Sequence, residues 1–157
     1  LRDGLPPLPP VLYNNPKEAA IMQNVIVVDA QGGGLGAAIV KKLIDMYGER
    51  ISLTALGTNV AATTAMKKAG ANRCATGENA VCFGAKSADI IIGGIGIIAS
   101  SGMLGEITPR MARAISESGA KKILVPLSRC NIIIPGLKEQ SAKTLIELAA
   151  AEIESLL

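Results

Sequence analysis

The chain has 157 residues, of which 49% are hydrophobic and only 2% aromatic, and its formal net charge is +3. Its lysine and arginine residues are scattered and stacking aromatics are scarce, which argues against nucleic acid as a partner. No apolar run is long enough to cross a bilayer, so the sequence also argues against a membrane-spanning protein.

Residues 1–20 form a proline-rich arm that differs from the rest, residues 21–157, which we expect to be a single domain. Proline removes backbone donors and favours an extended chain, so this arm is not expected to join a sheet. Its apolar side chains and the aliphatic surplus of the whole sequence predict a homo-oligomer to which the arm contributes. An arm folded back on its own domain and a PxxP ligand are the alternatives. The arm's apolar side chains are Leu5, Leu8, Val11, Leu12 and Tyr13.

The central motif begins with a β-branched run, residues 24–29, and continues through a glycine cluster into apolar residues at helical spacing. This order predicts a buried strand, a tight turn and a helix. The turn matches G-x-G-x-x-G/A, in which missing side chains let a phosphate approach the N-terminus of the helix. We expect a phosphate-bearing ligand there, the alternative being a turn that merely needs glycine. The residues concerned are Gly32, Gly33, Gly34, Leu35 and Gly36.

The remaining pattern alternates strands and helices. We expect strands at 50–56, 72–75, 88–98 and 121–127, with helices at 60–69, 78–87, 109–118 and 141–156. Thr58 or Asn59 caps the first of these helices, Gly70 ends it, and Thr108 followed by Pro109 begins the third. Right-handed crossovers then predict an α/β fold with a doubly wound, Rossmann-like parallel sheet of strand order 3-2-1-4-5. An extra C-terminal strand, residues 132–134, is expected at the edge.

Ligands of open α/β sheets bind beyond the carboxyl ends of the strands, where the strand order reverses. We therefore expect further contacts from Thr58, Asn59, Gly77, Glu78, Asn79, Gly94 and Gly96. A nucleotide or another phosphate-bearing small molecule is the expected ligand, with NAD(P) as the leading candidate cofactor. However, the second strand ends in Gly57-Thr58-Asn59 and lacks the acid that holds the ribose in dinucleotide sites. This leaves a mononucleotide or a phosphorylated metabolite open.

Candidate catalytic residues are few: the chain has no histidine, the side chain that most often transfers protons near neutral pH. Glu78 is a candidate general base, but it suits the first turn of a helix equally well. Cys130, beside Arg129, is a candidate thiolate, although a packed thiol is favoured. We expect Glu106 to face solvent. Binding is thus favoured over catalysis, and whether the protein is an enzyme stays open. The alternative function is a structural or regulatory homo-oligomer whose glycine loops only permit tight packing.

The three cysteines, Cys74, Cys82 and Cys130, lack C-x-x-C spacing and have no histidine to complete a metal site, so we expect no metal. Free thiols in the core fit a reducing compartment, and we expect the protein in the cytoplasm.

Four separated motifs carry a resemblance to a known family: VVDAQGGG at 27–34, ALGTN at 55–59, ATGENA at 75–80 and MLGEIT at 103–108. Together they resemble a family of short bacterial proteins, known as a domain of unknown function, over about residues 24–157. The resemblance implies no activity or catalytic residue. A weaker resemblance to Rossmann oxidoreductases is confined to the first strand–helix–strand unit and warrants no reaction.

Overall fold

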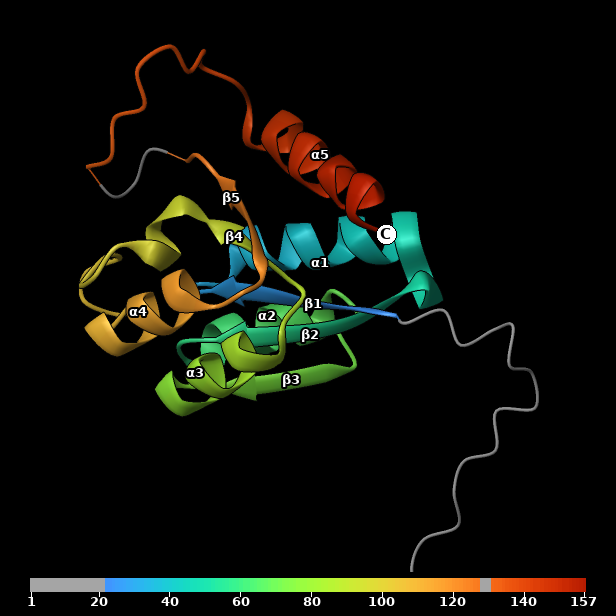
Figure 1. Ribbon diagram of the computed structural model, residues 1–157, viewed down its shortest axis with the longest axis horizontal. Helices are drawn as coiled ribbons and strands as arrows, with labels where there is room; N and C mark the ends of the chain where they lie inside the picture. The colour runs from blue at the N-terminus through green and yellow to red at the C-terminus, as the bar shows by residue number, and fades with distance from the viewer. Residues whose placement is uncertain (1–21, 128–130) are drawn as a thin grey trace, which may run out of the picture.

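The β-branched run after Gln23 forms the central strand of a five-stranded parallel sheet in the computed structural model (Figure 1). The structure describes residues 22–127 and 131–157, so the arm and Cys130 lie outside the described residues. The strands are β1 (Gln23–Asp29), β2 (Ile51–Gly57), β3 (Arg73–Thr76), β4 (Ile90–Gly94) and β5 (Lys121–Val125). Their order is β3-β2-β1-β4-β5, which confirms the predicted topology.

Helices cover both faces of the sheet. They are α1 (Gly34–Tyr47), α2 (Val60–Lys68), α3 (Glu78–Ser87), α4 (Pro109–Glu117) and α5 (Ala142–Glu152), with short 3-10 helices η1 (Gly48–Arg50), η2 (Ile95–Ile98) and η3 (Ile153–Leu156). Among the described residues, no helix is long and apolar enough to span a membrane.

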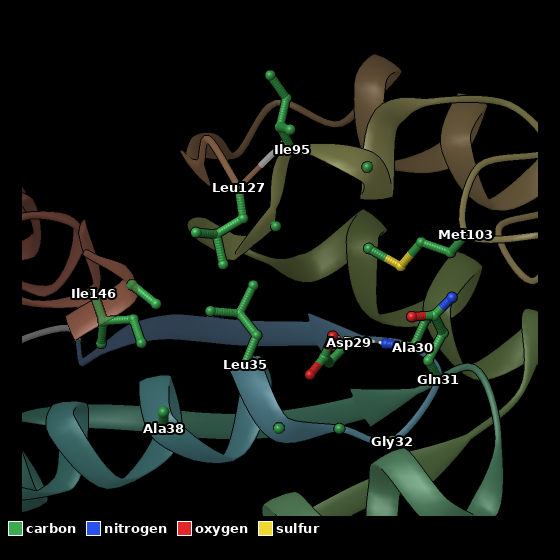
Figure 2. A pocket seen from close by; sticks show the side chains of 15 residues that line it. Asp29, Ala30, Gln31, Gly32, Leu35, Ala38, Ile95, Met103, Leu127 and Ile146 are labelled. Carbon is green, nitrogen blue, oxygen red and sulfur yellow. Dashed lines mark hydrogen bonds between the residues drawn. The ribbon is translucent and has the colours of Figure 1, made fainter. Parts of the chain in front are cut away.

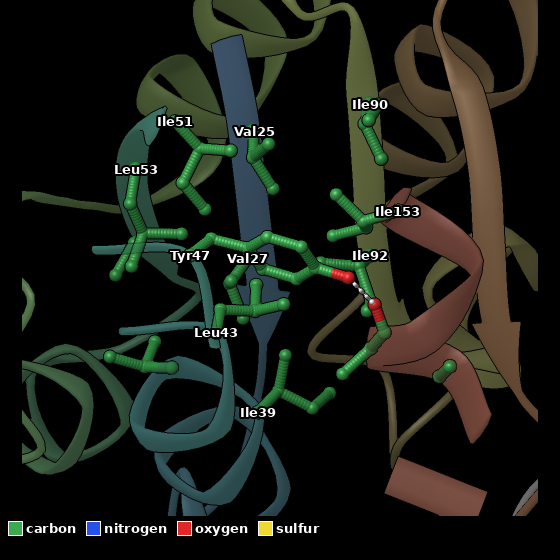
Figure 3. Close-up of a cluster of buried hydrophobic side chains, with 14 of the residues drawn as sticks. Val25, Val27, Ile39, Leu43, Tyr47, Ile51, Leu53, Ile90, Ile92 and Ile153 are labelled. Carbon is green, nitrogen blue, oxygen red and sulfur yellow. Dashed lines mark hydrogen bonds between the residues drawn. The ribbon is translucent and has the colours of Figure 1, made fainter. Parts of the chain in front are cut away.

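Successive side chains along a strand point to opposite faces of the sheet, and they form two hydrophobic cores, one on each face. Val25 and Val27 of β1 pack with α1, α2 and α5 on one face, whereas Ile26 and Val28 pack with α3 and α4 on the other. Figure 3 shows the first of these clusters, in which Tyr47 of α1 donates a hydrogen bond of 2.8 Å to the carbonyl of Ala150 in α5. A strand buried on both faces explains why the sequence of β1 is continuously apolar.

Two helix starts agree with the predicted caps. The side chain of Asn59 accepts from the N–H of Ala62 at the start of α2, and Thr108 accepts from Met111 at the start of α4. Gly70 follows α2 with a φ of +116°, as expected of a glycine after a helix.

One predicted strand is shorter than expected and another is absent from the described residues. The apolar run 88–98 is a strand only over Ile90–Gly94 and continues as the 3-10 helix η2. Residues 132–134 form no strand: they are exposed, and among the described groups their one backbone hydrogen bond, from the N–H of Leu137 to Ile134, closes a turn. A short apolar run does not reveal by itself whether a partner strand is available.

Candidate functional site at the switch point

The loop after β1 turns sharply into α1. Gln31 and Gly33 both have positive φ, 53° and 72°, and the N–H of Gly33 donates to the carbonyl of Ala30 at 3.1 Å. A side chain at Gly33 would lie 2.6 Å from the backbone of Ala62, so tight packing against α2 requires glycine there. Gly36 is similarly constrained by Asp29 and by the sulfur of Met66.

Gly32 and Gly34 have no such constraint. A Cβ atom at either position would meet no described atom within 4 Å, and neither residue has a positive φ. No described group accepts a hydrogen bond from the N–H of Gly34 or Leu35, the first two residues of α1. These N–H groups, at the positive end of the helix dipole, are therefore uncovered.

Asp29, the last residue of β1, lies beneath this loop and is only 4% exposed. Its carboxylate accepts from the N–H of Ala30 at 2.8 Å and from the N–H of Gly36 at 2.5 Å. Burial raises the pKa of Asp29 above its ordinary value, while these two hydrogen bonds act in the opposite direction. The acid thus fixes the turn and occupies the third N–H of α1.

A cleft of about 470 Å³ opens at this point, between α1, α5 and the ends of β1, β4 and β5 (Figure 2). Leu35, Leu127 and Ile146 point toward one another across it, and Met103 lies near Gln31 at its other end. The cleft therefore combines apolar walls with the uncovered N-terminus of α1. Its lining residues include Asp29, Gln31, Gly32, Gly33, Gly34, Leu35, Gly94, Ile95, Gly96 and Met103.

Glu106, expected from the sequence to face solvent, is only partly exposed and is held by hydrogen bonds. One of its carboxylate oxygens, Oε2, accepts three hydrogen bonds of 2.8 Å each, from the N–H of Gln31, the hydroxyl of Thr58 and the amide of Asn59. The N–H of Gln31 is the main cause that lowers the pKa of Glu106 below its ordinary value. The loop after η2 thereby crosses the end of β1 and reaches the end of β2. We call Glu106 with these three partners the Glu106 cluster.

The site residues expected from sequence fall into three places. Gly32, Gly33, Gly34, Leu35, Gly94 and Gly96 line the cleft, with Gly36 buried beneath it. Thr58 and Asn59 do not line it but join the Glu106 cluster at its border.

Gly77, Glu78 and Asn79 begin α3 and do not line the cleft. Glu78 instead accepts from the hydroxyl of Thr108 at 2.6 Å and pairs with Arg110 at 3.3 Å, which ties α3 to α4. Its contacts are those of a residue that joins two helices. Within the described part of the chain, no three His, Cys, Asp or Glu side chains gather as a metal site would need.

Comparison with solved structures gives one similar chain, a universal stress protein in complex with cAMP. It is 19% identical to this chain, covers 66% of it and 97% of its own length, and superposes with a TM-score of 0.38. Among curated proteins, none matches the chain. A family model does match, over residues 24–157, and its description is "Domain of unknown function (DUF3842)". The chain therefore belongs to this family, a domain of unknown function.

Proposed function

We propose that the protein binds a nucleotide or another phosphate-bearing small molecule in the cleft at the switch point of its sheet. The observation that carries this proposal is the uncovered start of α1. Gly32 and Gly34 are free of packing demands from the described residues, and the N–H groups of Gly34 and Leu35 have no described acceptor. A helix N-terminus with uncovered N–H groups and no side chain over it suits an anion.

The rest of the cleft suits the other half of such a ligand. Its walls include Leu35, Leu127 and Ile146, which offer apolar surface to a flat base or a similar group. A volume of about 470 Å³ lies in the range of small-molecule sites. This volume does not decide between NAD(P), the leading candidate from the sequence, and a mononucleotide, so the binding experiment below includes both. We assign no reaction to the site.

A thermal-shift panel tests the proposal. It contains AMP, ATP, GTP, NAD, NADP, FMN, coenzyme A and sugar phosphates. A ligand at about 100 times its dissociation constant stabilises the fold by roughly 2.7 kcal/mol. For a chain of this length, that raises the melting temperature by about 5–10 °C. We expect at least one clear rise of this size. A flat panel at millimolar ligand would show that the cleft does not bind this class of molecule.

The alternative role, a structural or regulatory homo-oligomer, rests on a different observation. Four large aliphatic side chains between residues 131 and 140 are exposed, with Ile133 at 88%. They are Ile132, Ile133, Ile134 and Leu137. We propose that the chain self-associates and that the arm, residues 1–20, contributes to the contact.

Cys74 and Cys82 are free thiols, which supports a reducing compartment such as the cytoplasm.

A further inference from the structure

The Glu106 cluster brings a carboxylate to the end of β2, where the strand itself supplies no acid. In dinucleotide-binding sheets an acid at the end of the second strand accepts hydrogen bonds from the ribose hydroxyls. Here Thr58 and Asn59 follow β2 directly, and both donate to the carboxylate of Glu106. The acid thus reaches the end of β2 from the loop after η2, a sequence separation of 48 residues from Thr58.

We infer that Glu106 is the ribose-holding acid of this site, so that the ligand is a nucleotide with a free 2′-hydroxyl and 2′-phosphorylated nucleotides are rejected. This inference rests on the proposed function and narrows its ligand class.

The carboxylate is held firmly, and Glu106, which borders the cleft without lining it, remains partly exposed. Oε2 already has three donors, whereas no described residue donates to Oε1. Oε1 is the atom assigned to accept from a ribose hydroxyl. Gln31 connects the two parts of the site, because its N–H donates to Glu106 and the residue itself lines the cleft.

Charge explains the rejection of a 2′-phosphate. Among the described residues, no lysine or arginine forms an ion pair with Glu106, so its negative charge is not neutralised by a cation. Its lowered pKa keeps the group ionised at neutral pH. A phosphate placed against this carboxylate would meet a like charge, which is unfavourable.

The loop that carries Glu106 is fixed on both sides. The N–H of Ser101 donates to the carbonyl of Ile107 at 2.8 Å, and Ile107 is fully buried. Thr108, two residues after Glu106, caps α4. Glu106 therefore sits on a fixed loop before any ligand arrives, as a specificity-determining side chain needs.

Isothermal titration of the full chain tests the inference with three matched compounds: AMP, 2′-deoxy-AMP and adenosine 2′,5′-bisphosphate. A hydrogen bond to a charged group corresponds to roughly a 10- to 100-fold difference in affinity. We expect AMP to bind at least about tenfold more tightly than either analogue. NAD should likewise bind more tightly than NADP.

Two variants and a control assign these preferences to Glu106. Glu106→Ala should bring both affinity ratios close to one. Glu106→Gln keeps an oxygen for the N–H of Gln31 but removes the charge, so it should lose the rejection of the 2′-phosphate even where Glu106→Ala folds poorly. Glu117→Gln removes an acid that pairs with Arg113 on α4 and should keep both wild-type ratios.

The outcomes separate the two proposals. If no compound of the wider panel binds, the proposed function and this inference both fail. If nucleotides bind but the wild-type protein treats AMP and its two analogues alike, the role of Glu106 is wrong and the proposed function stands. Binding of sugar phosphates without any nucleotide leads to the same conclusion.

Discussion

Substitution of Gly34 is the most direct test of the binding proposal. A side chain there would project into open space at the first turn of α1, where described packing does not oppose it. We expect Gly34→Val to change the free energy of unfolding by less than about 1 kcal/mol. The branched side chain should nevertheless cover the N–H groups and weaken ligand binding at least tenfold, as measured by titration.

Gly119 provides the matched control for this variant. A Cβ atom at Gly119 would also meet no described atom within 4 Å, and the residue has no positive φ, but it lies before β5, outside the cleft lining. Gly119→Val should leave affinity unchanged. Gly36→Ala should instead destabilise the fold by about 1–3 kcal/mol, because its side chain would overlap Asp29 and Met66. Equal affinity loss in the Gly34 and Gly119 variants would contradict the phosphate site.

The buried carboxyl group of Asp29 should make the stability of the protein depend on pH. Burial raises its pKa above 3.8, so the folded protein holds this proton to higher pH than the unfolded chain does. Its contribution to stability is therefore greatest below about pH 4 and falls as the pH rises through the raised pKa. Asp29→Asn should remove that fall, so the stability of the variant relative to wild type should increase with pH. Urea unfolding between pH 3 and 7 measures the difference in the free energy of unfolding between the variant and wild type. If that difference did not change with pH, it would argue against a raised pKa of Asp29.

Glu106 should act in the opposite sense. Its hydrogen bond from Gln31 lowers its pKa below 4.5, so its stabilising contribution is present above that pH and is lost as the pH falls through the folded-state pKa. In the same urea series, the advantage of wild type over Glu106→Gln should shrink toward low pH. An advantage that stays constant down to pH 3 would show that the three hydrogen bonds do not favour the ionised form.

At this scale the sequence predicted the glycine loop but missed Glu106. The loop is local, and its turn and helix lie within a few residues, so pattern alone identifies it. Glu106 acts through contacts with residues 75, 48 and 47 positions away. A lone acid in a loop carries no local sign of such partners, and its meaning appears only once the order of the strands is known.

Among the elements, α5 contributes part of the wall of the cleft through Ala142 and Ile146. Tyr47 ties α5 to α1 through the carbonyl of Ala150 and is almost fully buried. Tyr47→Phe removes this hydrogen bond, which should lower the free energy of unfolding by about 0.5–1.5 kcal/mol. Because α5 is then held less firmly, ligand affinity should also fall.

Ser118 supplies the comparison for Tyr47. Its hydroxyl donates to the carbonyl of Ala85 at 2.6 Å and so joins the end of α4 to α3 on the opposite face of the sheet. Ser118→Ala should destabilise the fold by a similar amount in thermal unfolding without changing ligand affinity. If the two variants affected affinity equally, the loss would reflect general destabilisation and not the position of α5.

The elements themselves were largely predictable, and the reasons are physical. Parallel strands buried on both faces leave uninterrupted β-branched runs, and helix caps such as Asn59 and Thr108 mark boundaries. The segment 132–134 was not predictable, since it has the composition of a strand but pairs with no strand among the described residues. Composition is a property of the segment, whereas pairing depends on where the rest of the chain places it.

For the molecule as a whole, the aliphatic content remains to be accounted for. The two hydrophobic cores bury the apolar side chains of the strands and of the inner faces of the helices. However, Ile133 remains 88% exposed, and Ile132, Ile134 and Leu137 are also exposed. Covering a large aliphatic side chain completely is worth about 1.5–3 kcal/mol. Contact with a second copy would remove this surface from water, and symmetric dimers are the commonest assembly.

We therefore predict that the full chain is a homo-oligomer in solution, as measured by light scattering at micromolar concentration. A chain lacking residues 1–20 should show a lower mean mass, because the arm's apolar side chains no longer contribute to the contact. Ile133→Lys should have the same effect, since a charge replaces an apolar side chain within the exposed segment. Phe83→Lys is the control: Phe83 is 73% exposed but lies on α3, away from that segment. A monomeric full chain refutes self-association, an unchanged mass after truncation refutes the part played by the arm, and an equal effect of the Phe83 and Ile133 variants refutes the location of the contact.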